Sequence, residues 1–187
     1  MPKITEAKIA ILATDGFEQS ELTEPLEKLR EAGATVHVIS PKGGSITGWD
    51  QDHWDKKIPV DKELSEVRTA DYDALVLPGG QINPDVLRAD AKVVSFVREF
   101  FNSKKPLAAI CHAPWLLVEA DVVRDRNVTS YKSIKTDLVN AGGKWQDESV
   151  VCHEALITSR NPGDLPAFIA KIIEEVEEGR HPDRRAA

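Results

Sequence analysis

The residues best suited to covalent chemistry in this sequence surround Cys111. An apolar run at residues 107–110 ends at this cysteine, with the small residues Ala109 two positions before it and Ala113 two positions after it. A segment of helical character follows. This pattern is typical of a nucleophile elbow, a sharp turn from a buried strand into a helix that raises one reactive side chain above a sheet. Because a helix N-terminus favours a thiolate, we predict that Cys111 is a nucleophile rather than a buried structural thiol.

A carboxyl group is the expected partner of this thiol. Glu18 lies in the first turn after a predicted strand at residues 8–13, at the sheet edge where Cys111 is also expected. A carboxyl group that keeps its proton can donate it in a hydrogen bond to a thiolate and activate the sulfur. Glu21, one turn further on, is the rival candidate, and the alternative for Glu18 is an acid favoured by the helix dipole or simply solvated.

Two glycines and a histidine complete the predicted site. Gly79 and Gly80 follow a predicted strand at residues 73–77, where they allow a tight turn and leave the backbone bare. We predict that backbone N–H groups of this turn, with that of His112, face the oxyanion formed when the thiolate attacks a carbonyl group. The sequence leaves open whether the His112 ring acts as a base or lies exposed at the elbow.

Other reactive side chains give weaker indications. Asp50, Asp52, His53 and Asp55 are metal-binding residue types, but their spacing matches no closed zinc or calcium loop, so we predict no metal site. No Walker A loop or GxGxxG motif occurs, and we expect no cofactor. Cys152 is expected in a strand, without an assigned role.

The elements that position these residues alternate along the chain. Strand-like apolar runs followed by amphipathic helical segments predict an α/β fold, a three-layer sandwich around a mostly parallel sheet. Ligands of such sheets bind beyond the carboxyl ends of the strands, where the loops at residues 14–18, 78–80 and 111–112 should meet. The predicted strands are residues 8–13, 35–40, 73–77, 107–110, 128–129, 149–152 and 155–159; the predicted helices are residues 17–32, 84–88, 91–102, 112–120, 134–141 and 164–178; residues 45–60 are expected to form a small hairpin or an excursion from the sheet.

Length and charge restrict the classes of function. The chain of 187 residues fits one domain, residues 1–187, with a polar tail at 180–187. Its net charge of −7 argues against nucleic acid and anionic membranes as partners. The apolar runs are too short to span a bilayer, and the first residues do not resemble a signal peptide. Two cysteines make no disulfide framework, so we expect reduced thiols and a cytoplasmic location.

Several segments resemble the PfpI branch of the ThiJ/PfpI superfamily, which is related to class I glutamine amidotransferases. The resemblance extends from about residue 7 to residue 168. The elbow and the TSRNPGDLP string are specific to the family, whereas Pro-Gly-Gly alone is common. The segments are FEQSEL at residues 17–22, LPGG at 77–80, AICHAP at 109–114 and TSRNPGDLP at 158–166, with further similarity at 137–143 and at Gly48-Trp49.

The resemblance implies a flavodoxin-like sandwich with Cys111 as nucleophile, His112 beside it and Glu18 as the carboxyl group that touches the sulfur. It also implies a homodimer, in some members built into a hexamer, with the site near an interface. Members are described as cysteine peptidases, general stress proteins, chaperones, and glyoxalases or deglycases for reactive carbonyls. We therefore expect a stress-response protein whose cysteine attacks a peptide or a small electrophile. The alternative is a non-enzymatic sensor of oxidative stress or a chaperone, in which Cys111 is oxidised to sulfinic acid.

Two positions depart from the family pattern. Ala113 stands where many relatives have glycine, a mild change that should fit. The turn at His153-Glu154 replaces an Asp-Gly-Asn string, so its tip should differ in shape. A glutaminase-type amidotransferase is a weaker interpretation, because it needs a downstream His-x-Glu pair and only His153-Glu154, without the spacer, is present.

Overall fold

A seven-stranded sheet forms the centre of the computed structural model, which describes residues 3–182. Residues 1–2 and 183–187 lie outside that range, and with them most of the polar tail expected at 180–187. The strands are β1 (Lys8–Leu12), β3 (Thr35–Ser40), β6 (Lys62–Glu63), β7 (Ala74–Leu77), β8 (Leu107–Ile110), β11 (Val150–His153) and β12 (Leu156–Ser159). Their spatial order is β11-β12-β8-β7-β1-β3-β6, and every neighbouring pair is parallel except β11 and β12.

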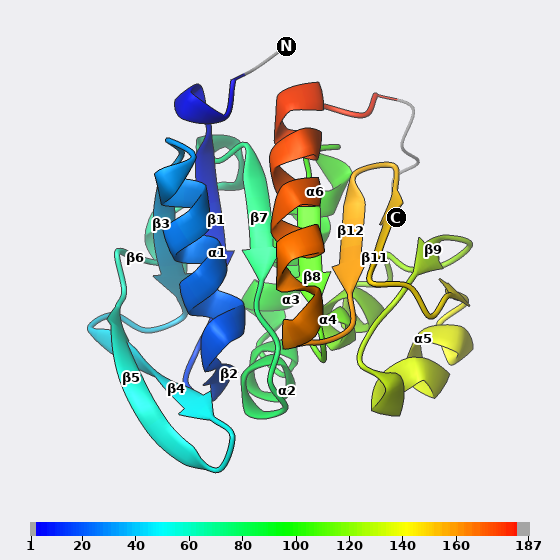
Figure 1. Cartoon of the computed structure of the whole chain (residues 1–187), viewed down its shortest axis with the longest axis horizontal. Coiled ribbons are helices and arrows are strands. Elements are labelled where there is room, and N and C mark those ends of the chain that lie inside the picture. Colours follow the sequence, from blue (N-terminus) through cyan, green and yellow to red (C-terminus); the bar gives the residue numbers. More distant parts are fainter. Residues whose placement is uncertain (1–2, 183–187) are drawn as a thin grey trace.

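Helices cover both faces of this sheet. The helices are α1 (Gln19–Glu31), α2 (Ile82–Arg88), α3 (Ala91–Asn102), α4 (Pro114–Glu119), α5 (Lys135–Asn140) and α6 (Leu165–Glu178), with short 3-10 turns at Ile4–Glu6, Leu64–Glu66, Thr69–Asp71, Lys132–Ile134 and Pro162–Asp164. Figure 1 shows α1 and α6 side by side on one face and α3 and α4 on the other. The predicted three-layer α/β sandwich is therefore confirmed. Of the helices within residues 3–182, none combines the length and the apolar character that a membrane crossing requires.

The two faces of the sheet carry separate apolar cores, as the alternation of side chains along a strand requires. On β1, Ile9 and Ile11 contact the core under α1 and α6, whereas Ala10 and Leu12 contact the core under α3 and α4. The central strands β7 and β8 are buried along their whole length. Phe168 of α6 has no exposed surface and anchors the first of these cores.

Two small sheets lie beside the central one. The segment at residues 45–60, for which we left a hairpin or an excursion open, forms the antiparallel hairpin of β4 (Ser45–Asp50) and β5 (His53–Pro59). β2 (Phe17–Glu18) pairs in parallel with β4, so the predicted helix at residues 17–32 begins two residues late. β9 (Asn127–Val128) and β10 (Lys144–Trp145) form the second small sheet.

The parallel strands direct their carboxyl ends to one edge. The arrowheads of β1, β7 and β12 point to the same end of the molecule, where α2, α4 and β2 lie (Figure 1). α6 runs in the opposite direction, so its C-terminal end lies at the other edge of the sheet. The loops after β1, β7 and β8 therefore meet as expected, and they carry the candidate residues.

Candidate active site

Cys111 sits at the sharp turn that ends β8. Its φ angle is +64°, in the left-handed region that a residue with a side chain adopts only when its surroundings hold it there. Two contacts do so: its N–H donates to the carbonyl oxygen of Ser159 (3.0 Å), and its carbonyl oxygen accepts from the N–H of Tyr131 (2.8 Å). The predicted elbow is thus present, but α4 begins only at Pro114 and has six residues. Little helix dipole is left to act on the thiol, since short helices have small dipoles.

Four hydrogen-bonding groups surround the Cys111 sulfur, and one of them is the His112 ring, with its Nδ1 3.1 Å away. The backbone N–H groups of Gly80 and His112 donate to it, and the Glu21 carboxyl group shares a hydrogen bond with it. The cysteine as a whole is only 5% exposed. A negative charge on this sulfur therefore meets donors supplied by two separate loops of the sheet edge.

The carboxyl group beside the sulfur belongs to Glu21, and our expectation that Glu18 makes this contact is wrong. Glu18 is the N-cap of α1, with extended backbone, so its side chain folds over the helix end. Its Oε2 accepts hydrogen bonds from the Glu21 N–H (2.8 Å) and the Ser20 hydroxyl (2.6 Å). Glu21, inside the first turn, has no exposed surface, and its Oε2 accepts from the Gly79 N–H (2.8 Å).

Gly79 and Gly80 do not share the role that we predicted for the N–H groups of their turn. The N–H of Gly79 is occupied by Glu21, so only that of Gly80 faces the sulfur with that of His112. A Cβ atom on Gly79 would lie 2.5 Å from the Glu21 carboxylate, 2.6 Å from the Ile110 carbonyl oxygen and 2.7 Å from Cys111 Cβ. Because Gly79 has no side chain, the Glu21 carboxyl group and the Cys111 thiol have room to come into contact. Gly80 has a φ of +81°, which glycine adopts without strain.

The electrostatics of Glu21 and Cys111 are coupled. Burial, reinforced by the negative charge of Glu18, raises the pKa of Glu21 from 4.5 to about 8, although N–H groups of Gly79 and Gly80 oppose the rise. Burial, followed by the charge of Glu21, also raises the pKa of the Cys111 thiol. Both groups resist being charged at once, so the pair titrates as a unit. When Glu21 holds the proton, the repulsion on the sulfur disappears and the carboxyl O–H becomes a third donor to a thiolate.

The His112 ring turns back to the nucleophile, which answers the question that the sequence left open. Its Nδ1 lies 3.1 Å from Cys111 Sγ and its Nε2 lies 3.1 Å from Ser133 Oγ. The ring stacks on Tyr131 with centroids 4.7 Å apart and contacts Trp115 edge-on. Burial lowers the pKa of His112, so the ring is neutral near pH 7 and able to accept a proton.

Ser133 and Tyr131 are site residues that the sequence did not indicate. They come from the segment between β9 and α5, some twenty positions after the elbow, and no motif marks them. The contact that brings this segment to the site is the hydrogen bond from the Tyr131 N–H to the Cys111 carbonyl oxygen. A backbone contact of this kind leaves no signal in residue type.

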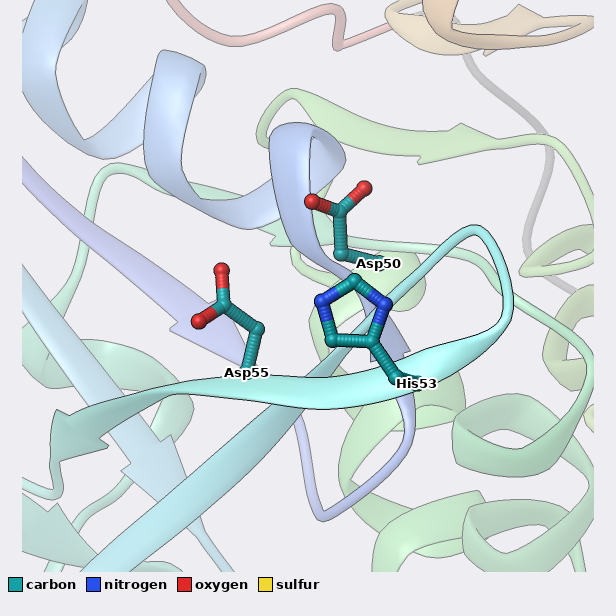
Figure 2. Close-up of side chains that lie close together, drawn as sticks. All are labelled: Asp50, His53 and Asp55. Carbon is teal, nitrogen blue, oxygen red and sulfur yellow. The ribbon is translucent and has the colours of Figure 1, made fainter.

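The acidic residues of the hairpin gather at its tip. Figure 2 shows Asp50, His53 and Asp55 projecting to the same side of the hairpin, and their ligand atoms lie within 4.8 Å of one another. The His53 Nδ1 is 2.9 Å from a carboxylate oxygen of Asp52, and Asp55 accepts from the Gln19 amide (2.8 Å). Hydrogen bonding to Asp52 raises the pKa of His53, which favours an imidazolium rather than a metal ligand.

Two further residues can now be placed. The Nδ1 of His153 accepts a hydrogen bond from the N–H of Asn127 in β9 (3.1 Å). This contact gives His153 a structural role. Ala113 has a φ of −57°, which any residue adopts, so alanine replaces glycine there without strain.

The chain is similar to known proteins over most of its length. Residues 7–175 match the model of the DJ-1/PfpI family. The chain is 46% identical over 162 residues to "Protein/nucleic acid deglycase 2" of Escherichia coli, which covers 86% of this chain and 92% of that protein. It is 43% identical over 162 residues to "Putative cysteine protease YraA" of Bacillus subtilis (86% and 93%), and 44% identical over 162 residues to "General stress protein 18" of the same organism (86% and 92%).

A solved structure extends the likeness to three dimensions. The two-domain protein of Anabaena variabilis with DJ-1/ThiJ/PfpI-like and ferritin-like domains superposes with a TM-score of 0.87 at 34% identity. The match covers 96% of this chain and 52% of that one, so this chain spans about half the length of that protein. The family match, the curated relatives and the superposition all agree, and the chain belongs to the DJ-1/PfpI family.

Proposed function

We propose that this protein is a cysteine-dependent stress-response enzyme that acts on small reactive carbonyl compounds, as glyoxalases and deglycases do. The observation that carries the proposal is the surroundings of the Cys111 sulfur, which combine two backbone donors, a buried acid and a neutral imidazole. The name of the Escherichia coli relative, a protein/nucleic acid deglycase, supports the same class of reaction.

The first step of the proposed reaction is addition of the thiolate to an aldehyde carbon. The carbon–sulfur bond forms, and the π electrons of the carbonyl group move to its oxygen. The N–H groups of Gly80 and His112 lie beside the sulfur, where this oxygen becomes negative. Glu21 gives its proton to the oxygen and is left as a carboxylate, and the product of the step is a neutral hemithioacetal on Cys111.

The second step converts a hemithioacetal of a 2-oxoaldehyde into a hydroxy acid. The neutral His112 ring accepts the proton from the carbon that bears sulfur, the electron pair of that C–H bond forms a carbon–carbon double bond, and the neighbouring carbonyl oxygen takes up the proton of the hydroxyl group. The imidazolium then returns its proton to the neighbouring carbon as the C=O bond forms beside sulfur, which yields a thioester of a 2-hydroxy acid. Water adds to the thioester, the carbon–sulfur bond breaks, and the acid leaves; the Cys111 thiolate is regenerated, and the second proton of the water restores protonated Glu21. The overall change is hydration and internal redox of the substrate, so no outside oxidant or reductant is required.

The small size of the substrate follows from access to the sulfur. Cys111 is 5% exposed, which suits an aldehyde or a glycated terminus better than an extended peptide laid across a groove. Peptide cleavage, the activity in the name of the YraA relative, is the other outcome of the test.

A second candidate function has its own observation. A sulfinate on Cys111 needs a proton donor beside it, and Glu21, with a pKa of about 8, carries that proton at neutral pH. The protein would then act as a sensor of oxidative stress. Mild peroxide treatment followed by mass spectrometry tests this role: two oxygens added at Cys111 and absent in Glu21→Gln support it, whereas equal oxidation of Cys152 contradicts it.

The decisive experiment measures methylglyoxal consumption together with lactate formation. The unmodified chain and Cys152→Ser should turn over, Cys111→Ser should be inactive, and Glu21→Gln should be strongly impaired because it can donate no proton. The same proteins are assayed against a fluorogenic peptide. Methylglyoxal turnover that persists in Cys111→Ser refutes the proposal. Peptide cleavage without methylglyoxal turnover also refutes it and would instead indicate that the protein is a cysteine peptidase.

The proposal includes a homodimer, with a hexamer as a further assembly, in the cytoplasm. Large apolar side chains are exposed at Trp54 (51%) and Val86 (53%), which supports a covered surface in the assembly. Tyr131, 40% exposed, stacks on His112 and would bring such an interface close to the site. The two unpaired cysteines support a reducing compartment. Sedimentation equilibrium tests the assembly, and a monomer at all concentrations contradicts it.

A further inference from the structure

A second group of reactive side chains lies at the C-terminal end of α6, at the edge of the sheet opposite to Cys111 (Figure 1). It consists of Glu175, Glu178 and His181, whose ligand atoms all lie within 4.8 Å of one another. The His181 Nε2 is 2.9 Å from Glu175 Oε2 and 3.8 Å from Glu178 Oε2. The reaction proposed above makes no use of these residues.

The end of the helix explains why they meet. Glu175 and Glu178 are three positions apart and so lie on one face of α6. Gly179 has a φ of +89°, which ends the helix and turns the chain back. The N–H of His181 then donates to the carbonyl oxygen of Lys104 (3.0 Å), which holds the imidazole over the two carboxylates.

Glu175 is the residue that points to a missing cation. It is 5% exposed, and its buried Oε2 atom, 2.9 Å from the His181 Nε2, makes no hydrogen bond of good geometry within residues 3–182. A buried carboxylate oxygen without a well-placed donor is costly. The negative end of the α6 dipole adds to this cost and equally favours a positive ion at the same place. The nearby Lys171 attracts Glu175 only through space, because its ammonium group is hydrogen-bonded to Glu174 (2.7 Å).

Cys152 of β11 supports Glu175 from the other side. Its thiol hydrogen-bonds to the Glu175 carboxylate. An S–H group in this place can donate to Glu175 and orient it. Donors behind a ligating carboxylate are typical of metal sites.

We propose that Glu175, Glu178 and His181 bind one Zn²⁺ ion, with the Cys152 thiol as the hydrogen-bond donor that orients Glu175. Ligand atoms at zinc's usual distance, arranged tetrahedrally, are about 3.3 Å apart, and the two separations of 2.9 and 3.8 Å lie on either side of this value. An imidazole with two carboxylates suits zinc, whereas calcium and magnesium require more oxygen ligands than this group supplies. The fourth position is left for water or an external ligand.

Zinc titration by calorimetry and by competition with a chromogenic chelator tests this site on the full-length chain. The Cys111→Ser background is used so that the catalytic thiol does not take up metal. We expect one zinc ion per chain. His181→Ala should weaken binding at least about 100-fold, more than changes outside the coordination sphere usually do, and Cys152→Ser about tenfold or less. His181 is partly exposed beyond the helix, so this variant should fold.

Two matched controls locate the ion. Glu174→Gln removes an exposed carboxylate of the same helix, and His53→Ala removes the imidazole of the hairpin cluster; both should bind zinc as the parent does. Failure of the parent to bind zinc overturns the proposal, as does binding that survives His181→Ala or disappears in His53→Ala. The remaining possibility is that His181 only forms an ion pair with the carboxylates. In that case zinc does not change the unfolding temperature of the parent, although His181→Ala still destabilises the fold.

Discussion

The replacement Glu21→Gln should remove a large pH dependence from the stability of the protein. Burial and the charge of Glu18 raise the pKa of Glu21 from 4.5 to about 8. Between these values the folded chain holds a proton that the unfolded chain has released, so the free energy of unfolding falls as the pH rises. The stabilisation is complete below about pH 4.5 and is lost by the time the pH passes about 8.

The size of the effect follows from the same values. A rise in pKa from 4.5 to about 8 corresponds to about 5 kcal/mol at about 1.36 kcal/mol for each pH unit. This is a ceiling, because small movements and entering water lower the cost of a buried charge. Glutamine mimics the protonated acid: its oxygen can accept from the Gly79 N–H and its amide can donate toward residue 111. The variant should therefore gain about 2–3 kcal/mol relative to the parent between pH 5 and pH 7.

Urea unfolding from pH 5 to pH 9 measures this difference. The Cys111→Ser background removes the thiol that titrates together with Glu21, so only the carboxyl group contributes. Glu24→Gln, an exposed position on the same helix, is the matched control and should parallel the parent. Parallel profiles for Glu21→Gln and its parent would refute the conclusion that burial keeps this acid protonated.

Three further changes test other contacts. Gly79→Ala should destabilise the fold by about 1–3 kcal/mol in urea and slow alkylation of the nucleophile, because its Cβ would lie 2.5 Å from the Glu21 carboxylate; an unchanged alkylation rate contradicts this. Ser133→Ala should cost about 1 kcal/mol or less in stability and lower kcat about fivefold with KM unchanged, since the Nε2 of His112 loses its hydrogen-bond partner. A roughly fivefold increase in KM with kcat unchanged would indicate a role in substrate binding instead. Phe168→Ala should cost about 3–5 kcal/mol in urea, because its ring is completely buried; a cost below about 1 kcal/mol would show that the core collapses around the gap.

The architecture could be predicted because buried strands and amphipathic helices leave separate periodicities in the sequence. The runs at β1, β7 and β8 are apolar throughout, as strands covered on both faces must be. The Cys111 elbow was visible for the same reason. Its helix was expected too early, since Cys111, His112 and Ala113 form a turn before Pro114 starts α4.

The choice between two acids could not be made from the sequence. Glu18 and Glu21 are separated by less than one helical turn, and which of them faces the sheet depends on the residue at which α1 begins. Helix boundaries are the least certain part of such a prediction. The strand pairing of Phe17 and Glu18 with the hairpin delays the helix, which makes Glu18 the cap and directs Glu21 to the sulfur.

The close fit of Gly79 has a consequence for how the protein comes into being. The Glu21 carboxylate of α1 and the Ile110–Cys111 turn after β8 meet around this glycine, so three segments that are distant in the chain come together there. An incomplete chain on the ribosome, or one with any of these segments undocked, carries an ordinary cysteine. The surroundings of the Cys111 sulfur therefore exist only in the folded chain, and the rate at which a thiol reagent labels Cys111 should distinguish native protein from chains in which this cysteine is exposed.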